Sequence, residues 1–244
     1  MGLLGMILAA VVVAILLAIV IVKYLPLKLK WLASVLLLAL TVFLVYKIYY
    51  GIMQPIIFNK EKVTKYSKVI KNLKIIRDAE VKHFEVTGKY TNNKTSLIQF
   101  IDTAQLALTE TKTIVEKEDR GGGIVIDVEK RITDTIGYEP VAKYFKGKDY
   151  KNMFKVPGVA GKEFDIEIGT VEKVQGLVVP TFFVKTEKAG ILKGMNESLI
   201  KQELEAVATD QIKGEFVSVG SLDEVTSGGN WPPSYDKKDG DKKE

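Results

Sequence analysis

The side chains that carry most enzyme chemistry are scarce in this sequence. The chain has no cysteine and a single histidine, His83. Disulfides, thiolate metal sites and cysteine nucleophiles are therefore excluded, as is a zinc site built on several histidines of one chain. His83 falls at the edge of an apolar helix face, which favours a partly packed structural role. Any site chemistry has to come from carboxylates, hydroxyls or backbone amides.

Two acidic pairs have a spacing that suits acid/base or metal chemistry. Asp165 and Glu167 alternate with isoleucines, so both carboxylates fall on the solvent side of an expected strand. Glu203 and Glu205 lie on an expected helix, where a separation of two residues turns side chains about 200° apart. Neither pair converges on a site, and no serine stands in a nucleophile elbow.

The glycine run at 121–123 is the remaining candidate for a ligand loop. A phosphate loop needs a following Lys-Ser/Thr and a strand-to-helix context, which this run lacks. We predict instead a hairpin between strands at 111–117 and 124–131. The sequence therefore predicts a protein that is not an enzyme, with no cofactor, no metal and no identified small-molecule substrate. A membrane-bound enzyme whose site is assembled from scattered residues stays open.

The first of the elements that would position any site is an expected membrane-spanning region. Residues 1–57 are almost entirely apolar, and residues 3–22 contain no charge, a length that spans a hydrocarbon core of about 30 Å. A second apolar run covers residues 31–50, and Pro26 suits a tight turn between the two. We predict a two-helix transmembrane hairpin, with a cleaved signal peptide as the alternative for the first run.

The expected spans carry no Asp, Glu, Arg or His, so they indicate an anchor in the lipid bilayer rather than an ion pathway. Their orientation depends on lysines. Lys23, Lys28 and Lys30 lie in the short loop, and Lys60, Lys62, Lys65 and Lys68 follow the second run. Because the first helix usually dominates, we favour a soluble part outside the cytoplasm over a cytoplasmic one.

An amphipathic stem helix is expected over residues 60–87, after a break or kink at residues 51–59 caused by Pro55. At 100° per residue, one arc of this helix collects the apolar side chains. These are Val63, Tyr66, Val69, Ile70, Leu73, Ile76, Val81 and Phe84. We take Tyr66, Val69, Ile70 and Leu73 as the candidate interaction face.

Basic residues recur every three positions along the same helix, from Lys62 to Arg77. A spacing of three winds around a helix, so these cations form no stripe, and a solvated surface explains them. The functional alternative is contact with anionic lipid head groups through Lys60, Lys65 and Lys68, which requires a cytoplasmic domain. Nucleic acid is not an expected partner, because the net charge is only +5 and no aromatic stacking set accompanies the lysines.

Two longer stretches of the sequence resemble known groups of proteins. The segment IRDAEVKHFEVTGKYTNNKTSLIQFID, with Gly88 and Tyr90 at the helix end, resembles the stem region of type IV pilins and type II secretion pseudopilins. The segment FNKEKVTKYSKVIKNLKIIRDAEVKHFEVTGKYTNNKTSLIQFIDT, with DTIGYEPV and GSLDEVTSGGNWPPSY, resembles uncharacterised membrane-anchored proteins of Gram-negative bacteria. The second resemblance implies the bacterial inner membrane and a periplasmic domain, and it brings no activity.

The rest of the chain predicts a β-rich part. Strands are expected at 164–168, at 177–185 as an edge strand or bulge because of Pro180, and at 215–219. A helix capped by Asn196 is expected to Ala208, with Leu199, Ile200, Leu204 and Val207 on one face. The expected fold class is α+β: residues 1–57 form the transmembrane hairpin, 58–110 the stem helix and a short helix, 111–235 an antiparallel β-rich domain with one or two packed helices, and 236–244 a disordered tail.

An inert anchor, a long stem and no catalytic constellation together favour a non-enzymatic function. We expect a membrane-tethered domain that binds another protein or an envelope component as an assembly subunit, with a protein partner or a homo-oligomer. Three alternatives stay open: a pilin-like or pseudopilin-like filament subunit, a membrane-bound enzyme, and a lipid-surface binder with a cytoplasmic domain.

Overall fold

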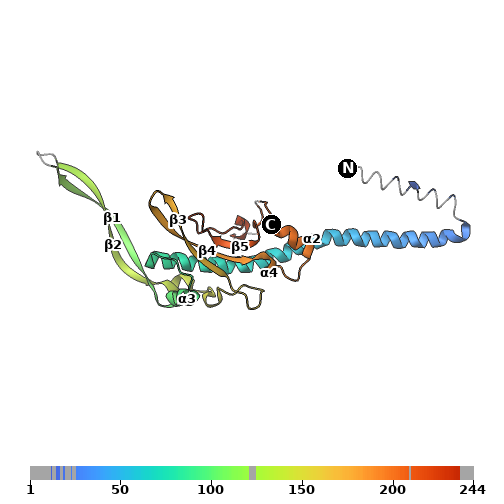
Figure 1. The fold of residues 1–244 in the computed structure, drawn as a ribbon, viewed down its shortest axis with the longest axis horizontal. Helices are drawn as coiled ribbons and strands as arrows, with labels where there is room; N and C mark the ends of the chain where they lie inside the picture. The colour runs from blue at the N-terminus through green and yellow to red at the C-terminus, as the bar shows by residue number, and fades with distance from the viewer. Residues whose placement is uncertain are drawn as a thin grey trace. The chain divides into compact units, whose positions relative to one another are not determined.

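The protein has an α+β fold in which one long helix precedes antiparallel sheets and a few short helices (Figure 1). A computed structural model describes residues 26–120, 125–208 and 210–236, together with Val12, Ile15, Leu16, Ile19 and Lys23. The chain divides into two compact units, residues 1–59 and residues 60–244. Helix α2 (Leu27–Thr87) contributes to both units.

The first unit is built on the apolar part of α2. From Trp31 to Tyr50 its large hydrophobic side chains are exposed, and among the described residues α2 is the one helix that is long and apolar enough to cross a membrane. The expected second span lies within this helix. Of the expected first span, only Val12, Ile15, Leu16 and Ile19 are described, each in helical conformation, and a two-helix hairpin is not shown.

The expected break at residues 51–59 is wrong, while the alternative, a kink there, stays a prediction. Helix α2 continues through Gly51 and Pro55 without interruption. A proline in a helix forfeits one amide hydrogen bond, here the bond to the Gly51 carbonyl four residues earlier. The helix is long on both sides of Pro55, so the loss of one bond does not end it.

The end of α2 is set by a glycine, as the sequence indicates. Gly88 takes a left-handed φ of 71° and donates its amide N–H to the Phe84 carbonyl at 2.8 Å. The chain then turns back, so that the Tyr90 ring stacks on Phe84 and contacts Phe182, both at centroid distances of 4.8 Å. Helix α3 (Lys94–Thr103) follows, with Asn93 as its N-cap.

A long two-stranded ribbon follows α3. Strand β1 (Gln105–Asp119) pairs antiparallel with β2 (Val125–Pro140), with a register shift at Leu108/Thr109. Figure 1 shows β1 and β2 with no further strand beside them. The predicted hairpin is confirmed and is longer than expected; its glycine run at 121–123 and Ile124 lie outside the described residues.

After short 3-10 turns at Val141–Phe145 and Tyr150–Asn152, the chain forms a three-stranded antiparallel sheet in the order β3-β4-β5. Its strands are β3 (Asp165–Val174), β4 (Leu177–Glu187) and β5 (Phe216–Gly220). Strand β4 is the central strand, not an edge strand. Pro180 is accommodated because β5 pairs only with residues 183–187, which leaves one side of Pro180 without a neighbouring strand.

Two short helices lie between β4 and β5: α4 (Lys188–Ile191) and α5 (Glu197–Leu204). The Asn196 cap is confirmed, since its side chain accepts from the amides of Ser198 and Leu199. The predicted apolar face is confirmed in part, since Leu199, Ile200 and Leu204 are half-buried. It is wrong for Val207, which is 84% exposed beyond the end of α5 at Leu204, and the fully buried residue of α5 is Glu203.

The C-terminal segment returns to the sheet and to α2. Gly220 ends β5 with a φ of 78°, and a Cβ there would lie 2.1 Å from the Phe182 carbonyl oxygen, so only glycine fits. The 3-10 turn Pro233–Tyr235 follows. Asp236, expected in the disordered tail, accepts from the Trp231 indole and pairs with Lys74; residues 237–244 lie outside the described residues.

Candidate functional site

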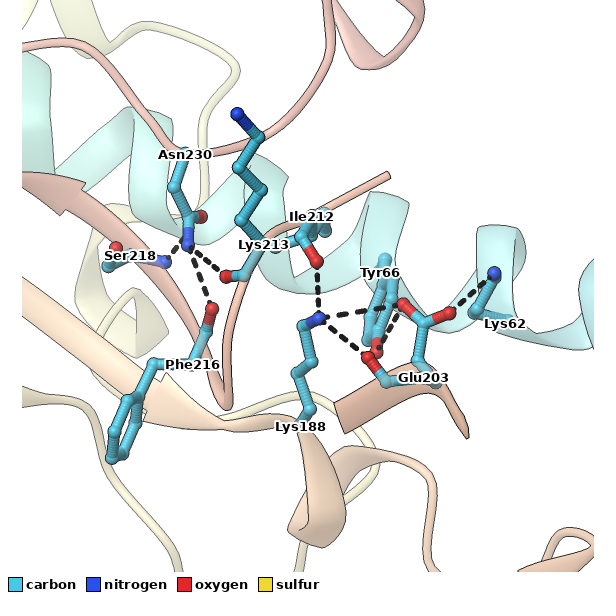
Figure 2. Close-up of polar contacts among 9 residues, drawn as sticks. All are labelled: Lys62, Tyr66, Lys188, Glu203, Ile212, Lys213, Phe216, Ser218 and Asn230. Carbon is cyan, nitrogen blue, oxygen red and sulfur yellow. Dashed lines mark hydrogen bonds and ion pairs between the residues drawn. The ribbon is translucent and has the colours of Figure 1, made fainter. Parts of the chain in front are cut away.

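Three charged side chains meet in the interior of the second unit, and we call Lys62, Lys188 and Glu203 the ion cluster. Lys62 Nζ lies 2.8 Å from Glu203 Oε2, and Lys188 Nζ lies 3.6 Å from Glu203 Oε1 (Figure 2). The three residues are between 0% and 8% exposed. They come from α2, α4 and α5, so the cluster joins the stem helix to the segment between β4 and β5.

The cluster is closed by further polar contacts. Lys188 Nζ donates to the carbonyl of Glu203 at 3.1 Å and to the carbonyl of Ile212. The Tyr66 hydroxyl donates to Glu203 Oε1 at 3.4 Å. Burial raises the pKa of Tyr66, and the Glu203 carboxylate raises it further. Burial and the same carboxylate raise the pKa of Tyr235 to about 12. Both tyrosines therefore stay neutral at physiological pH.

A buried lysine suggests nucleophilic chemistry, and burial does lower the pKa of Lys188. A nucleophile must reach a substrate, however, and Lys188 is 0% exposed with its ammonium directed at two carbonyls and a carboxylate. The open hollow formed by residues 155–163 includes no member of the ion cluster. The ion cluster therefore has a structural role: it links the stem helix α2 to α4 and α5.

A second buried carboxylate lies further along α2. Glu80 is 0% exposed; its Oε2 accepts from the Thr91 amide at 3.1 Å, while Oε1 has no hydrogen-bond partner among the described residues. Burial raises the pKa of Glu80 to about 7, and the Thr91 hydrogen bond opposes this shift. Lys62 and Glu80 are eighteen residues apart, which is five helical turns, so they share one face of α2.

Figure 2 also shows an asparagine that holds the C-terminal segment on the sheet. Asn230 Oδ1 accepts from the Ser218 amide at 3.0 Å, and its Nδ2 donates to the Phe216 carbonyl at 2.8 Å. A weaker bond of 3.4 Å reaches the Lys213 carbonyl. These bonds replace the strand that β5 lacks on this side, which is a structural role.

The candidate interaction face predicted on the stem is not on the surface. Each of its residues is at most 1% exposed, because the rest of the second unit covers this side of α2. They are Tyr66, Val69, Ile70 and Leu73. The face is also rotated from the predicted arc: Lys62 turns inward to Glu203, and Val63 is 47% exposed.

The lysines predicted to contact lipid head groups have unlike environments. Lys65 donates to the Ile191 carbonyl at 3.1 Å, so this lysine attaches α4 to the stem. Lys60 and Lys68 are exposed. The carboxylates of the two acidic pairs do not converge in the described structure: Glu203 joins the ion cluster, while Glu205, the C-cap residue of α5, is exposed. His83 donates its Nδ1–H to the Lys89 carbonyl, 2.7 Å away, and its ring packs against Phe100.

Sequence reasoning missed the ion cluster. Lys62 looked like one of many surface lysines, Lys188 followed a strand without special context, and Glu203 was judged only against Glu205. One signal was present: Lys62 falls within the apolar arc of the stem, between residues that pack in the core. Its partners are 126 and 141 residues away, and nothing local identifies them.

The β1–β2 ribbon differs from the ion cluster in that its side chains are exposed rather than buried. Large apolar side chains are exposed along it, with exposed fractions of 59% for Val115, 65% for Ile136 and 69% for Tyr138. Between Ala107 and Ile136 no side chain of the described part of the ribbon is buried. A two-stranded ribbon of this kind has little stability of its own in water, which makes it a candidate binding surface.

The described residues contain no group of three or more His, Cys, Asp or Glu that could hold a metal ion. Comparison with known proteins gives no relative: no family model, no curated protein and no solved structure matches this chain.

Proposed function

We propose that the protein is a non-enzymatic, membrane-anchored assembly subunit whose soluble part binds another protein. One observation carries this proposal: the β1–β2 ribbon, about 50 Å long from the rise per residue of a strand, exposes Val115, Ile136 and Tyr138 over about half of its length. Monomeric soluble proteins rarely expose extended apolar surface without a use for it. The ion cluster, by contrast, is occupied by internal contacts.

The proposed anchor is a two-helix hairpin with spans at residues 3–22 and 31–50 in a bacterial inner membrane. The exposed apolar part of α2 supports the second span. The soluble part is proposed to be periplasmic, on the lysine distribution given above. Since the chain has no cysteine, a single Lys201→Cys on the exposed surface of α5 provides a clean label site. Labelling by a membrane-impermeant maleimide in intact spheroplasts is expected; labelling only after lysis would place the domain in the cytoplasm.

Binding is tested by introducing a photo-crosslinking amino acid at Tyr138 or Val115 of the full chain in the cells that make it. Position Lys201 on α5 is the matched exposed control. Adducts identified by mass spectrometry are expected from the ribbon positions and not from the control. Absence of ribbon adducts, together with migration of the solubilised protein as a solitary monomer on native gels, would contradict the proposal.

A pilin-like filament subunit is the second candidate. The observation that favours it is the continuity of α2, which runs from an apolar part into a part buried against a β-rich domain, as the resemblance to the pilin stem region implies. This candidate predicts regular polymers in negative-stain electron micrographs of overexpressing cells. Absence of such polymers would rule out the filament subunit, and the assembly-subunit proposal would stand.

A further inference from the structure

Residues 88–93 join the stem helix α2 to α3, and we call them the stem turn. The Gly88 amide donates to the Phe84 carbonyl at 2.8 Å, which fixes the start of the turn on the end of α2. The Tyr90 ring follows, stacked on Phe84 and in contact with Phe182. The first half of the stem turn is therefore held by a helix-end hydrogen bond and by ring packing.

The second half of the stem turn is held by one carboxyl group of the stem helix. Thr91 donates its amide to Glu80 Oε2 at 3.1 Å, and the Asn93 amide donates back to the Thr91 hydroxyl. Among the described residues, Glu80 is the one side chain of α2 that accepts a hydrogen bond from residues 91–93. Asn92 and Asn93 are exposed, so water lies on the outer side of this segment.

Glu80 has the surroundings of a neutral carboxyl group. It is 0% exposed, and its Oε1 has no hydrogen-bond partner among the described residues. Burial raises the pKa of Glu80 to about 7, although the Thr91 amide opposes the shift. An ionised carboxylate with one donor gains free energy when water reaches it. Water reaches Glu80 if the stem turn moves away from α2, because this surface segment is the one bonded to the carboxyl.

The other titratable and charged groups near the stem turn differ from Glu80. Burial and the Glu80 charge raise the pKa of Tyr90, so this phenol stays neutral at physiological pH. Lys94 of α3 is paired with Glu163 at 2.8 Å. His83 contacts the turn through a main-chain carbonyl, and its Nδ1–H can donate there in the neutral and in the charged ring. Further charged groups of α2 pair with each other: Arg77 with Asp78, and Lys82 with Glu85.

We propose that Glu80 is the proton sensor of a local conformational switch: its neutral form holds the stem turn closed on α2, and its ionised form favours an open turn. Opening moves Thr91 away from Glu80 and the Tyr90 ring away from its packing partners. The movement ends in α3, because Leu97 and Ile101 are 0% exposed and fix that helix in the core. The switch therefore acts where the stem meets the helix that leads to the ribbon. It goes beyond the proposed function and does not depend on it.

The pH range of the switch follows from the two environments of Glu80. In the open turn the carboxyl is solvated and has its ordinary pKa of 4.5, and in the closed turn the pKa is about 7. Below pH 4.5 both forms hold the proton, and the turn is most firmly closed. Between pH 4.5 and 7 the equilibrium constant for opening rises about tenfold per pH unit, by about 300-fold in total, and it is constant at higher pH.

Amide hydrogen exchange measured by mass spectrometry tests the switch in the detergent-solubilised full chain between pH 5 and pH 8. Exchange rates corrected for the intrinsic pH dependence of amide exchange report the opening constant. For residues 90–94 of the wild type, the corrected rate is expected to rise about 70-fold over this range. These residues are also expected to exchange faster than residues 97–103 of α3 at every pH, because the opening is local.

Two glutamine variants assign the pH dependence. Glu80→Gln keeps an oxygen that can accept from Thr91 but cannot ionise, so the corrected rate of residues 90–94 is expected to be constant from pH 5 to pH 8. Glu163→Gln removes an exposed carboxylate beside the same segment, and it is expected to keep the wild-type rise. Circular dichroism identifies a variant that fails to fold, and the wild-type measurement needs no variant.

Three results would overturn the inference. A corrected rate that does not change with pH in the wild type would mean that Glu80 does not control the stem turn. Equal rates for residues 90–94 and 97–103 at each pH would mean that the turn opens only when the second unit unfolds. A rise that persists in Glu80→Gln would assign the pH dependence to another group, such as His83.

Discussion

Two buried glutamates in the second unit have opposite surroundings. Glu203 lies between Lys62 and Lys188 and accepts from Tyr66. Glu80 is as deeply buried and has one amide donor, from Thr91, and no facing cation in hydrogen-bond or ion-pair contact among the described residues. Tyr90 is the titratable group coupled to it. Burial favours the neutral form of a carboxyl unless a counter-charge compensates. The surroundings of Glu203 therefore favour its charged carboxylate, and those of Glu80 favour its neutral, protonated form.

The largest effect is expected at Glu203. Glu203→Gln leaves Lys62 and Lys188 buried without their carboxylate, and the free energy of unfolding should fall by about 3–5 kcal/mol. The measurement is urea unfolding of the detergent-solubilised chain, followed by the fluorescence of Trp231, which is buried. A change below about 1 kcal/mol would mean that the cluster is solvated.

Glu80→Gln should change the pH dependence of stability. Below the unfolded pKa of 4.5, both states hold the proton and the site contributes its full stability. Between 4.5 and about 7 the folded state keeps a proton that the unfolded state releases, so stability falls as pH rises, by up to about 3 kcal/mol, and is then constant. Glutamine does not titrate. The variant should therefore match the wild type at pH 4 and exceed it at pH 8.

The control for this prediction is Glu163→Gln on an exposed carboxylate paired with Lys94. The Lys94 ammonium lowers the pKa of Glu163, so this group has the opposite shift and sits at the surface. Its substitution should not remove the decrease between pH 4.5 and 7. If the wild type shows no decrease in that range, Glu80 is not a buried neutral carboxyl.

Lys62→Met should have a smaller effect than Glu203→Gln. Glu203 keeps Lys188 and Tyr66, so one charge-assisted hydrogen bond is lost and a chain of similar length fills the space, at a cost of about 2 kcal/mol. A double-mutant cycle with Glu203→Gln measures the coupling of the pair. A coupling near zero would show that Lys62 and Glu203 act independently.

Tyr66→Phe is expected to have the smallest effect. The ring stays in the core, and the hydrogen bond that is lost is long, at 3.4 Å, so the cost should be about 1 kcal/mol or less. The same unfolding assay measures it. A loss comparable to that of Glu203→Gln would mean that the hydroxyl, rather than the two lysines, stabilises the carboxylate.

Local signals predicted the local elements. The end of α2 at Gly88, the Asn93 and Asn196 caps and the hairpin strands depend on a few neighbouring residues. The Asn93 cap itself was not singled out, although Asn three residues before a helix amide is a readable pattern. The break at Pro55 was predicted from a local rule, and the length of the helix on either side overrode it.

The rotation of the stem helix shows where local rules end. Val63 lies in the predicted buried arc. Lys62 lies within the same arc but is predicted to be solvated with the other lysines, because hydrophobicity is the only criterion a single helix offers. In the folded chain Lys62 is inside because Glu203 comes from α5 to meet it. The prediction that Pro180 marks an edge strand or a bulge fails for a similar reason: β5 (216–220) makes β4 central by pairing with residues 183–187, and no local pattern shows that this pairing stops short of Pro180.

By itself, the sequence determined the apolar N-terminal region, the α+β class, and the absence of cysteine chemistry, since these depend on composition and on periodicities of two to four residues. The tertiary structure alone decided which charged residues are buried, which face of the stem is covered, and that the ribbon stands without a third strand. Burial and pairing of charges depend on segments more than a hundred residues apart, and no local pattern encodes such a distance.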